Sequence, residues 1–212
     1  MQDKPVSRPV HDLLCQALET EIGGVAVYQM AVLCAENEDL REEWENYLQQ
    51  TERHVTIVRG IFEALGMDPE ATTPGRTIVR DKAQCLVSAM RKALKDAPNS
   101  AQVVAAECVI DAETKDHLNW QLIGELSKQA DGELGRALAH AYEEVEEEED
   151  EHLYHTRGWC RELWLDTLDL PAEMPPPEEE RDVKSALEAA KVEQKRKSKK
   201  RRDRGEEASA ST

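Results

Sequence analysis

The chain has 212 residues and a formal net charge of −17 at pH 7, which is enough for one sizeable domain with an extension. Its 10 glycines, 9 prolines and single phenylalanine favour an all-α protein over a sheet. No apolar run approaches the roughly 18 residues of a membrane span, and residues 1–11 lack the apolar core of a signal peptide. Five cysteines without a Cys-x-x-Cys pair argue against a disulfide framework, a zinc ribbon or an iron–sulfur site. We therefore expect a cytoplasmic protein that does not enter a membrane.

Four long helices are expected in chain order, over residues 8–36, 39–65, 100–129 and 131–168. Ser7 can cap the first helix, Asp39 with Glu42 forms a plausible capping box for the second, and Gly66 ends it. The long connection that follows contains an amphipathic stretch at 77–95. Two helical hairpins joined in this way, over residues 8–170, predict a four-helix bundle with one long crossover that carries an extra helix.

The C-terminal residues differ from the rest in charge. Pro171 and Pro175–Pro177 end the helical region, and a linker with a short charged helix is expected up to residue 194. Residues 195–204 (KRKSKKRRDR) carry a net charge of +7, so the remainder carries −24. We expect 195–212 to be a disordered basic tail. It could bind nucleic acid through phosphate contacts; the alternative is an arm that improves solubility or contacts another subunit.

Two histidines occupy equivalent positions on apolar helical stripes, so both should point into a core. The first stripe runs Leu40, Trp44, Tyr47, Thr51, His54, Val58, Ile61 and Leu65. The second runs Leu138, Tyr142, Val145, Glu149, His152, Thr156, Trp159 and Leu163. Glu149 belongs to an acidic run, 143–151, whose other acidic residues fit a solvated face. Glu149 and His152 thus form a Glu-x-x-His pair on a buried stripe.

Two further glutamates lie on apolar faces of the other two long helices. Glu21 precedes Tyr28 by seven residues, and Glu113 precedes Trp120 by seven. Burial of an unpaired carboxylate costs several kcal/mol, about 3–5 when a partner is missing, so each must be paired or bound to a metal.

The sequence predicts a metal site that these residues would form together: Glu21, His54, Glu113, Glu149 and His152. Carboxylates with some imidazole suit Fe or Mn better than zinc. Each residue also has a structural alternative. Glu149 and His152 could form a buried ion pair, the other glutamates could accept hydrogen bonds from core Tyr or Trp, and His54 could be a satisfied core histidine.

With these motifs, residues 8–168 resemble the ferritin-like superfamily of di-metal carboxylate proteins, especially rubrerythrin, bacterioferritin and manganese catalase. The family pattern is a Glu with an aromatic residue seven positions on, then Glu-x-x-His, repeated in the second hairpin. Glu21 and Glu113 match the first element, and Glu149 with His152 matches the second. The resemblance implies one or two Fe or Mn ions that react with O2 or H2O2, as in an oxidase, peroxidase or catalase-like enzyme of oxidative-stress or metal handling.

The second helix departs from the family pattern, because Thr51 stands where a ligand glutamate is expected, three residues before His54. Three carboxylates would hold a second divalent ion more weakly. Side chains that could compensate are Gln50, Glu19, Asp111 and His117. The alternative function is a non-enzymatic ferritin-like stress or scaffold protein with a degenerate site, associated with nucleic acid through its tail. A homodimer is also expected, because the apolar face at 77–95 needs a packing partner.

Overall fold

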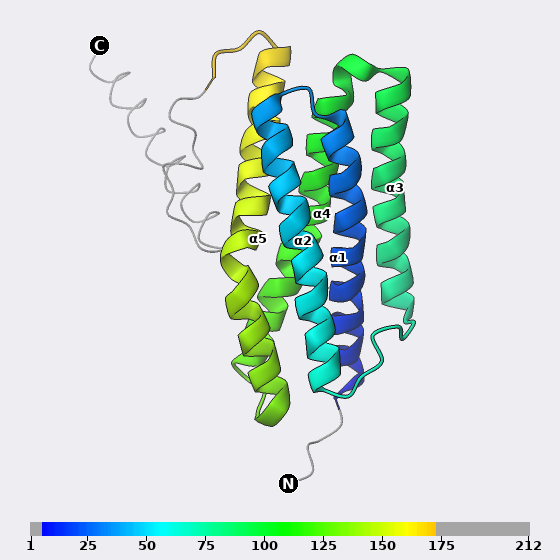
Figure 1. Ribbon diagram of the computed structural model, residues 1–212, viewed down its shortest axis with the longest axis vertical. Coiled ribbons are helices and arrows are strands. Elements are labelled where there is room, and N and C mark those ends of the chain that lie inside the picture. Colours follow the sequence, from blue (N-terminus) through cyan, green and yellow to red (C-terminus); the bar gives the residue numbers. More distant parts are fainter. Residues whose placement is uncertain (1–5, 173–212) are drawn as a thin grey trace, which may run out of the picture. The chain divides into compact units, whose positions relative to one another are not determined.

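The computed structural model describes residues 6–172, which form five long α-helices and no strand (Figure 1). These are α1 (Arg8–Cys34), α2 (Glu38–Ala64), α3 (Pro74–Asp96), α4 (Ala101–Ser127) and α5 (Gly132–Thr167), with a short 3-10 helix, η1 (Pro98–Ser100), before α4. The prediction of an all-helical protein is confirmed. The predicted linker helix, the basic tail and the nucleic-acid contact at 195–204 lie outside the described residues.

Local capping explains where α2 begins and ends. The side chain of Asn37 accepts a hydrogen bond from the Leu40 amide at 3.0 Å, so the cap lies two residues before the predicted Asp39. Gly66 follows the last turn with φ of +60°, a conformation that glycine adopts without strain. The Met67 amide then bonds back to the Phe62 carbonyl at 2.8 Å, which closes the helix end.

The helices lie side by side (Figure 1), and α1 packs against α2, α3 and α4, while α5 packs against α4 and α2. Helix α3, in the long connection, covers α1 and α4 and buries Val79 and Met90. The apolar face at 77–95 is therefore covered within the chain only in part, since Ile78 is 57% exposed. The expected homodimer stays a prediction. Within residues 6–172, no helix has an apolar stretch long enough to cross a membrane.

Two apolar clusters fill the interior at different levels. One contains Leu14, Leu18, Phe62, Trp120 and Leu138; the other contains Tyr28, Trp44, Met90 and Val109. Along α1, Glu21 falls between the Leu14–Leu18 part of one cluster and the Val27–Cys34 part of the other. The interior thus holds a polar layer between two apolar layers, which shield it from water.

Candidate metal centre

All five predicted ligands lie in this polar layer and are buried. Glu21 comes from α1, His54 from α2, Glu113 from α4, and Glu149 with His152 from α5. They form two overlapping groups, Glu21–His54–Glu149 and Glu113–Glu149–His152. Within each group, one nitrogen or oxygen atom per residue lies within 4.8 Å of the others. The structure therefore brings together the five side chains that the sequence analysis predicted as metal ligands.

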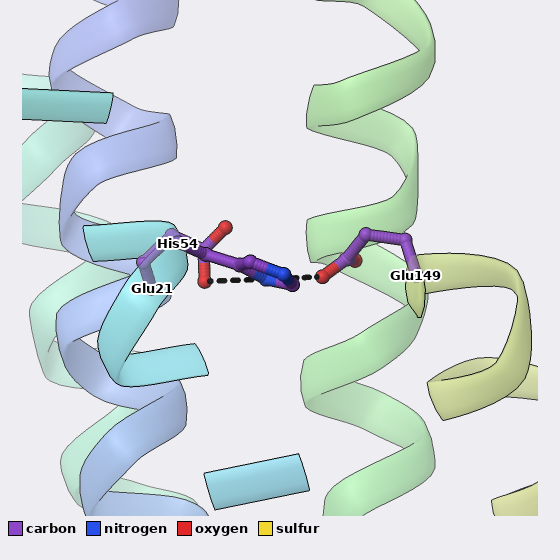
Figure 2. Close-up of side chains that lie close together, drawn as sticks. All are labelled: Glu21, His54 and Glu149. Atoms are coloured by element: carbon purple, nitrogen blue, oxygen red, sulfur yellow. Dashed lines mark ion pairs between the residues drawn. The ribbon is translucent and has the colours of Figure 1, made fainter. Parts of the chain in front are cut away.

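His54 lies between two carboxylates from different helices (Figure 2). Its Nδ1 is 3.1 Å from Oε1 of Glu149 and 3.7 Å from Oε2 of Glu21. The side chains of His54 and Glu21 are fully buried, and that of Glu149 is 2% exposed. The imidazole thus presents one nitrogen to a closed space lined by carboxylate oxygens.

His152 likewise lies near two carboxylates, those of Glu113 and Glu149 in the second group. Its Nδ1 is 3.7 Å from Oε2 of Glu113 and 3.7 Å from Oε1 of Glu149. The His54 and His152 rings are stacked, with centroids 5.7 Å apart. The same oxygen of Glu149 therefore faces the Nδ1 atoms of both histidines, which makes Glu149 the residue common to the two groups.

The outer nitrogens of the two imidazoles have acceptors that fix the ring orientation. Nε2 of His54 is 2.8 Å from Oε2 of Glu148, a carboxylate that Arg53 also binds. Nε2 of His152 is 2.8 Å from Oε1 of Gln50. When each Nε2–H donates outward, Nδ1 carries a lone pair that points into the site, which is the tautomer a metal requires. Gln50, which the sequence offered as a compensating residue, thus orients His152.

Asp116 is a site residue that the sequence analysis missed. It lies one turn after Glu113 on α4 and is 5% exposed. Its charge adds to the raised pKa values of Glu21 and Glu113, and it partly opposes the fall that burial causes in the pKa of His54. The spacing Glu113-x-x-Asp116 equals that of Glu149-x-x-His152, a signal present in the sequence. Asp116 is therefore a fourth buried carboxyl beside the cluster, outside the two groups of ligand atoms, whereas α2 offers only Thr51.

The other proposed compensators lie away from the cluster. Glu19 pairs with Arg76 at 2.7 Å and Arg80 at 2.6 Å. Asp111 lines a separate cavity of about 550 Å³ between α1, α3 and α4. His117 is 3.5 Å from Asp150. Thr51 itself is buried, and its hydroxyl donates to the Tyr47 carbonyl of its own helix at 2.9 Å.

The four carboxyl groups resist ionisation in one another's presence. Burial raises the pKa of Glu21, Glu113 and Asp116 well above the usual range, and the negative charge of Glu149 raises each further. Burial, with the neighbouring charges of Glu148 and Asp150, raises the pKa of Glu149 to about 8. Burial also lowers the pKa of His54 and His152, so both imidazoles are neutral. A cation would relieve the repulsion and use the lone pairs.

Internal hydrogen bonds leave the atoms that face this space unsatisfied. Trp120 donates a hydrogen bond to Oε1 of Glu21 at 2.7 Å. This is the hydrogen bond from a core tryptophan that was the alternative to metal binding for Glu21. Buried ligand-type atoms of these side chains without a hydrogen-bond partner are Oε2 of Glu21, Nδ1 of His54, Oε2 of Glu113, Oδ1 of Asp116, Oε2 of Glu149 and Nδ1 of His152. Buried polar atoms are rarely left unpaired, and all six are metal-ligand types, so the residues fit a metal centre.

Comparisons of the chain with models of protein families, with curated proteins and with solved structures found no match.

Proposed function

We propose that the chain is a ferritin-like metalloprotein whose four helices α1, α2, α4 and α5 form the bundle around a centre for two Fe or Mn ions. The observation that carries the proposal is the convergence of five buried ligand side chains into two overlapping groups that share Glu149, in which Nδ1 of both histidines has no hydrogen-bond partner. Four carboxylates and two neutral imidazoles match the oxygen-rich, nitrogen-containing donor sets of Fe and Mn. Four negative charges balance two divalent cations. Asp116 would therefore replace the carboxylate that is missing because position 51 is a threonine.

Glu149 would bridge the two ions, since its carboxylate belongs to both groups. Glu21 and His54 would complete one subsite, and Glu113 and His152 the other. Asp116, buried one turn after Glu113 on α4, would supply a further carboxylate to the cluster. Glu148 and Gln50 would hold the two imidazoles in the ligating tautomer.

The bound metal would supply redox chemistry with O2 or H2O2, in an oxidase, peroxidase or catalase-like reaction. The chain's contribution is to hold the ligands and to exclude water with the apolar layers on either side. His54 and His152 stay neutral, so they bind the cation without first losing a proton.

The test is metal content per chain after anaerobic loading with Fe(II) or Mn(II) and removal of excess. The wild type should retain two ions. Glu149→Ala should lose both because it removes the shared ligand, and Asp116→Asn should retain one. The matched control is Glu151→Ala, an exposed position two residues further along α5 that should leave loading unchanged.

Equal loading of Glu149→Ala and the wild type, with the helical signal intact, would overturn the metal assignment. A wild type that binds no transition metal would favour the second candidate, a non-enzymatic scaffold, which the threonine at position 51 supports. Two ions retained in Asp116→Asn would remove Asp116 from the ligand set.

A further inference from the structure

A hydrogen-bonded group of oxidisable side chains extends from His152 toward the surface. The Tyr47 ring lies with its centroid 4.3 Å from that of His152. Its hydroxyl donates to Oε1 of Glu43 at 2.7 Å and lies 3.0 Å from Nδ1 of His155. The indole of Trp159 donates to the other oxygen of the same carboxylate, Oε2, at 2.8 Å. Glu43 thus joins a buried phenol to an indole.

The exposure of these side chains changes steadily along the group. Tyr47 is 2% exposed, the Glu43 side chain 25%, and the His155 side chain 49%. Trp159 is half-buried on the α5 side. Tyrosine and tryptophan are the side chains most readily oxidised by one electron, and an oxidised phenol needs a proton acceptor within hydrogen-bond distance. Tyr47 has that acceptor, and Trp159 shares it.

We propose that Tyr47 and Trp159, joined by the carboxylate of Glu43, form a relay that carries one electron between the Glu/His cluster and the surface, while Glu43 accepts and returns the proton of the oxidised side chain. The physiological role of this relay rests on the proposed function, because its oxidant is the proposed metal centre. The oxidant is the metal centre after its reaction with peroxide, and the reductant is a one-electron donor at the surface. Aromatic side chains that serve only as core would satisfy the same hydrogen bonds, so the relay must be tested by electron movement.

The relay step balances on the chain's own groups. When Tyr47 gives one electron to the centre, its hydroxyl proton moves to Oε1 of Glu43. When the surface donor returns an electron through Trp159, that proton returns to the Tyr47 oxygen. Oxidation that begins at Trp159 sends the indole proton to Oε2. Electron transfer from Tyr47 then restores the indole with that proton, while the phenol proton passes to Oε1.

The relay can be tested in the full-length protein without metal, by pulse radiolysis with the azidyl radical. This one-electron oxidant attacks accessible indoles and is reduced to azide. Trp44 and Trp120 are at most 1% exposed, whereas Trp164 is 41% exposed. A Trp164→Phe background therefore leaves Trp159 as the accessible indole among the four tryptophans.

In that background the tryptophanyl absorption should convert to tyrosyl absorption at a rate independent of protein concentration. Tyr47→Phe should abolish this phase, and Glu43→Gln should slow it by roughly tenfold or more because the proton acceptor is lost. The control is Tyr142→Phe, since Tyr142 packs against the other apolar cluster. It should leave the phase unchanged, and all variants should keep the wild-type helical signal.

An unchanged conversion in Tyr47→Phe, or no concentration-independent phase in the background protein, would overturn the relay. This result does not depend on metal. A wild type that shows the phase but binds no metal would contradict the proposed function and leave the relay chemistry standing. In metal-loaded protein treated with H2O2, a tyrosyl signal lost in Tyr47→Phe at unchanged metal content would connect the two.

Discussion

Glu19 and Glu21 lie two residues apart on α1 and are both buried, at 4% and 0% exposure. Two residues correspond to about 200° around a helix, so the side chains face opposite sides. Glu19 faces α3, where Arg76 and Arg80 bind both of its oxygens. Glu21 faces the interior, where its neighbours include three further carboxyl groups, Glu113, Asp116 and Glu149.

The two glutamates have opposite pKa shifts for this reason. Burial alone would raise the pKa of Glu19, but hydrogen bonds from Arg80 and Arg76 lower it below its usual range. Burial raises the pKa of Glu21, and the charges of Asp116 and Glu149 add to the rise against one hydrogen bond from Trp120. The chain itself supplies the counter-charge of Glu19, whereas Glu21 has no cationic side chain bound to it, and the proposed metal would supply its counter-charge.

The largest effect is expected at the α1–α3 ion pair. Arg76→Met keeps much of the side-chain volume and removes the charge, so it leaves Glu19 with Arg80 alone. Breaking a buried ion pair should lower the free energy of unfolding by about 3 kcal/mol, measured by chemical denaturation. The control is Arg59→Met, since Arg59 pairs with Glu70 at 2.9 Å and both side chains are exposed. That change should cost about 0–1 kcal/mol.

Metal content separates the two regions further. Arg76→Met should retain the metal loading of the wild type, because Arg76 lies outside the polar layer. Equal stability losses in the Arg76 and Arg59 variants would show that the buried ion pair contributes no more to stability than the exposed one. Loss of metal in Arg76→Met would show that the two sides of α1 are coupled.

The second effect is the dependence of metal-free stability on pH. Well above pH 6.5, the ordinary pKa of histidine, His54 and His152 are neutral whether the chain is folded or unfolded. The buried carboxyls then hold protons that the unfolded chain has lost, since their ordinary values are 4.5 for Glu and 3.8 for Asp. The folded state binds more protons, so the free energy of unfolding falls as the pH rises.

For Glu149 this fall continues to about pH 8, where the group ionises in the folded protein. The expected loss from pH 6.5 to 8 is about 2 kcal/mol for one carboxyl that stays protonated. Denaturation of metal-free protein across this range measures it, and saturating Mn(II) should restore the stability. A metal-free stability that rises over the same range would show that the cluster is already compensated without a cation. Glu19 contributes in the opposite sense, and its contribution is lost only as the pH falls below 4.5.

The sequence predicted the helices closely because their signals are local. The expected second helix, 39–65, is observed as Glu38–Ala64, and the stretch at 77–95 is observed within Pro74–Asp96. Apolar spacing sets the faces, and Gly66 and Pro98 mark the ends. The same spacing placed Glu21 and His152 inside, because a residue on an apolar stripe must face the core.

Contacts between distant residues could not be predicted in this way. Glu19 and Arg76 are 57 positions apart, and only the packing of α3 on α1 brings them together. The sequence therefore offered Glu19 as a ligand candidate, although it is an ion-pair residue. Asp116 was not predicted, for another reason. It does not belong to the family pattern, and its signal in the sequence is the spacing of three residues from Glu113. Which charged residues of different helices meet can be known only from the fold.

The smallest effect tests Glu21 against Glu19 directly. Glu21→Gln removes one of four mutually repelling carboxyls and can still accept the Trp120 hydrogen bond, so metal-free protein at pH 8 should gain about 1 kcal/mol. The matched variant Glu19→Gln should lose stability, because it leaves Arg76 buried without its counter-charge. Denaturation at pH 8, with and without Mn(II), measures the free energy of unfolding of both variants. Glu21→Gln should also lose much of the stabilisation by metal, whereas Glu19→Gln should keep it. If both variants were destabilised alike without metal, Glu21 would be an ordinary structural residue, and its charge would need no cation.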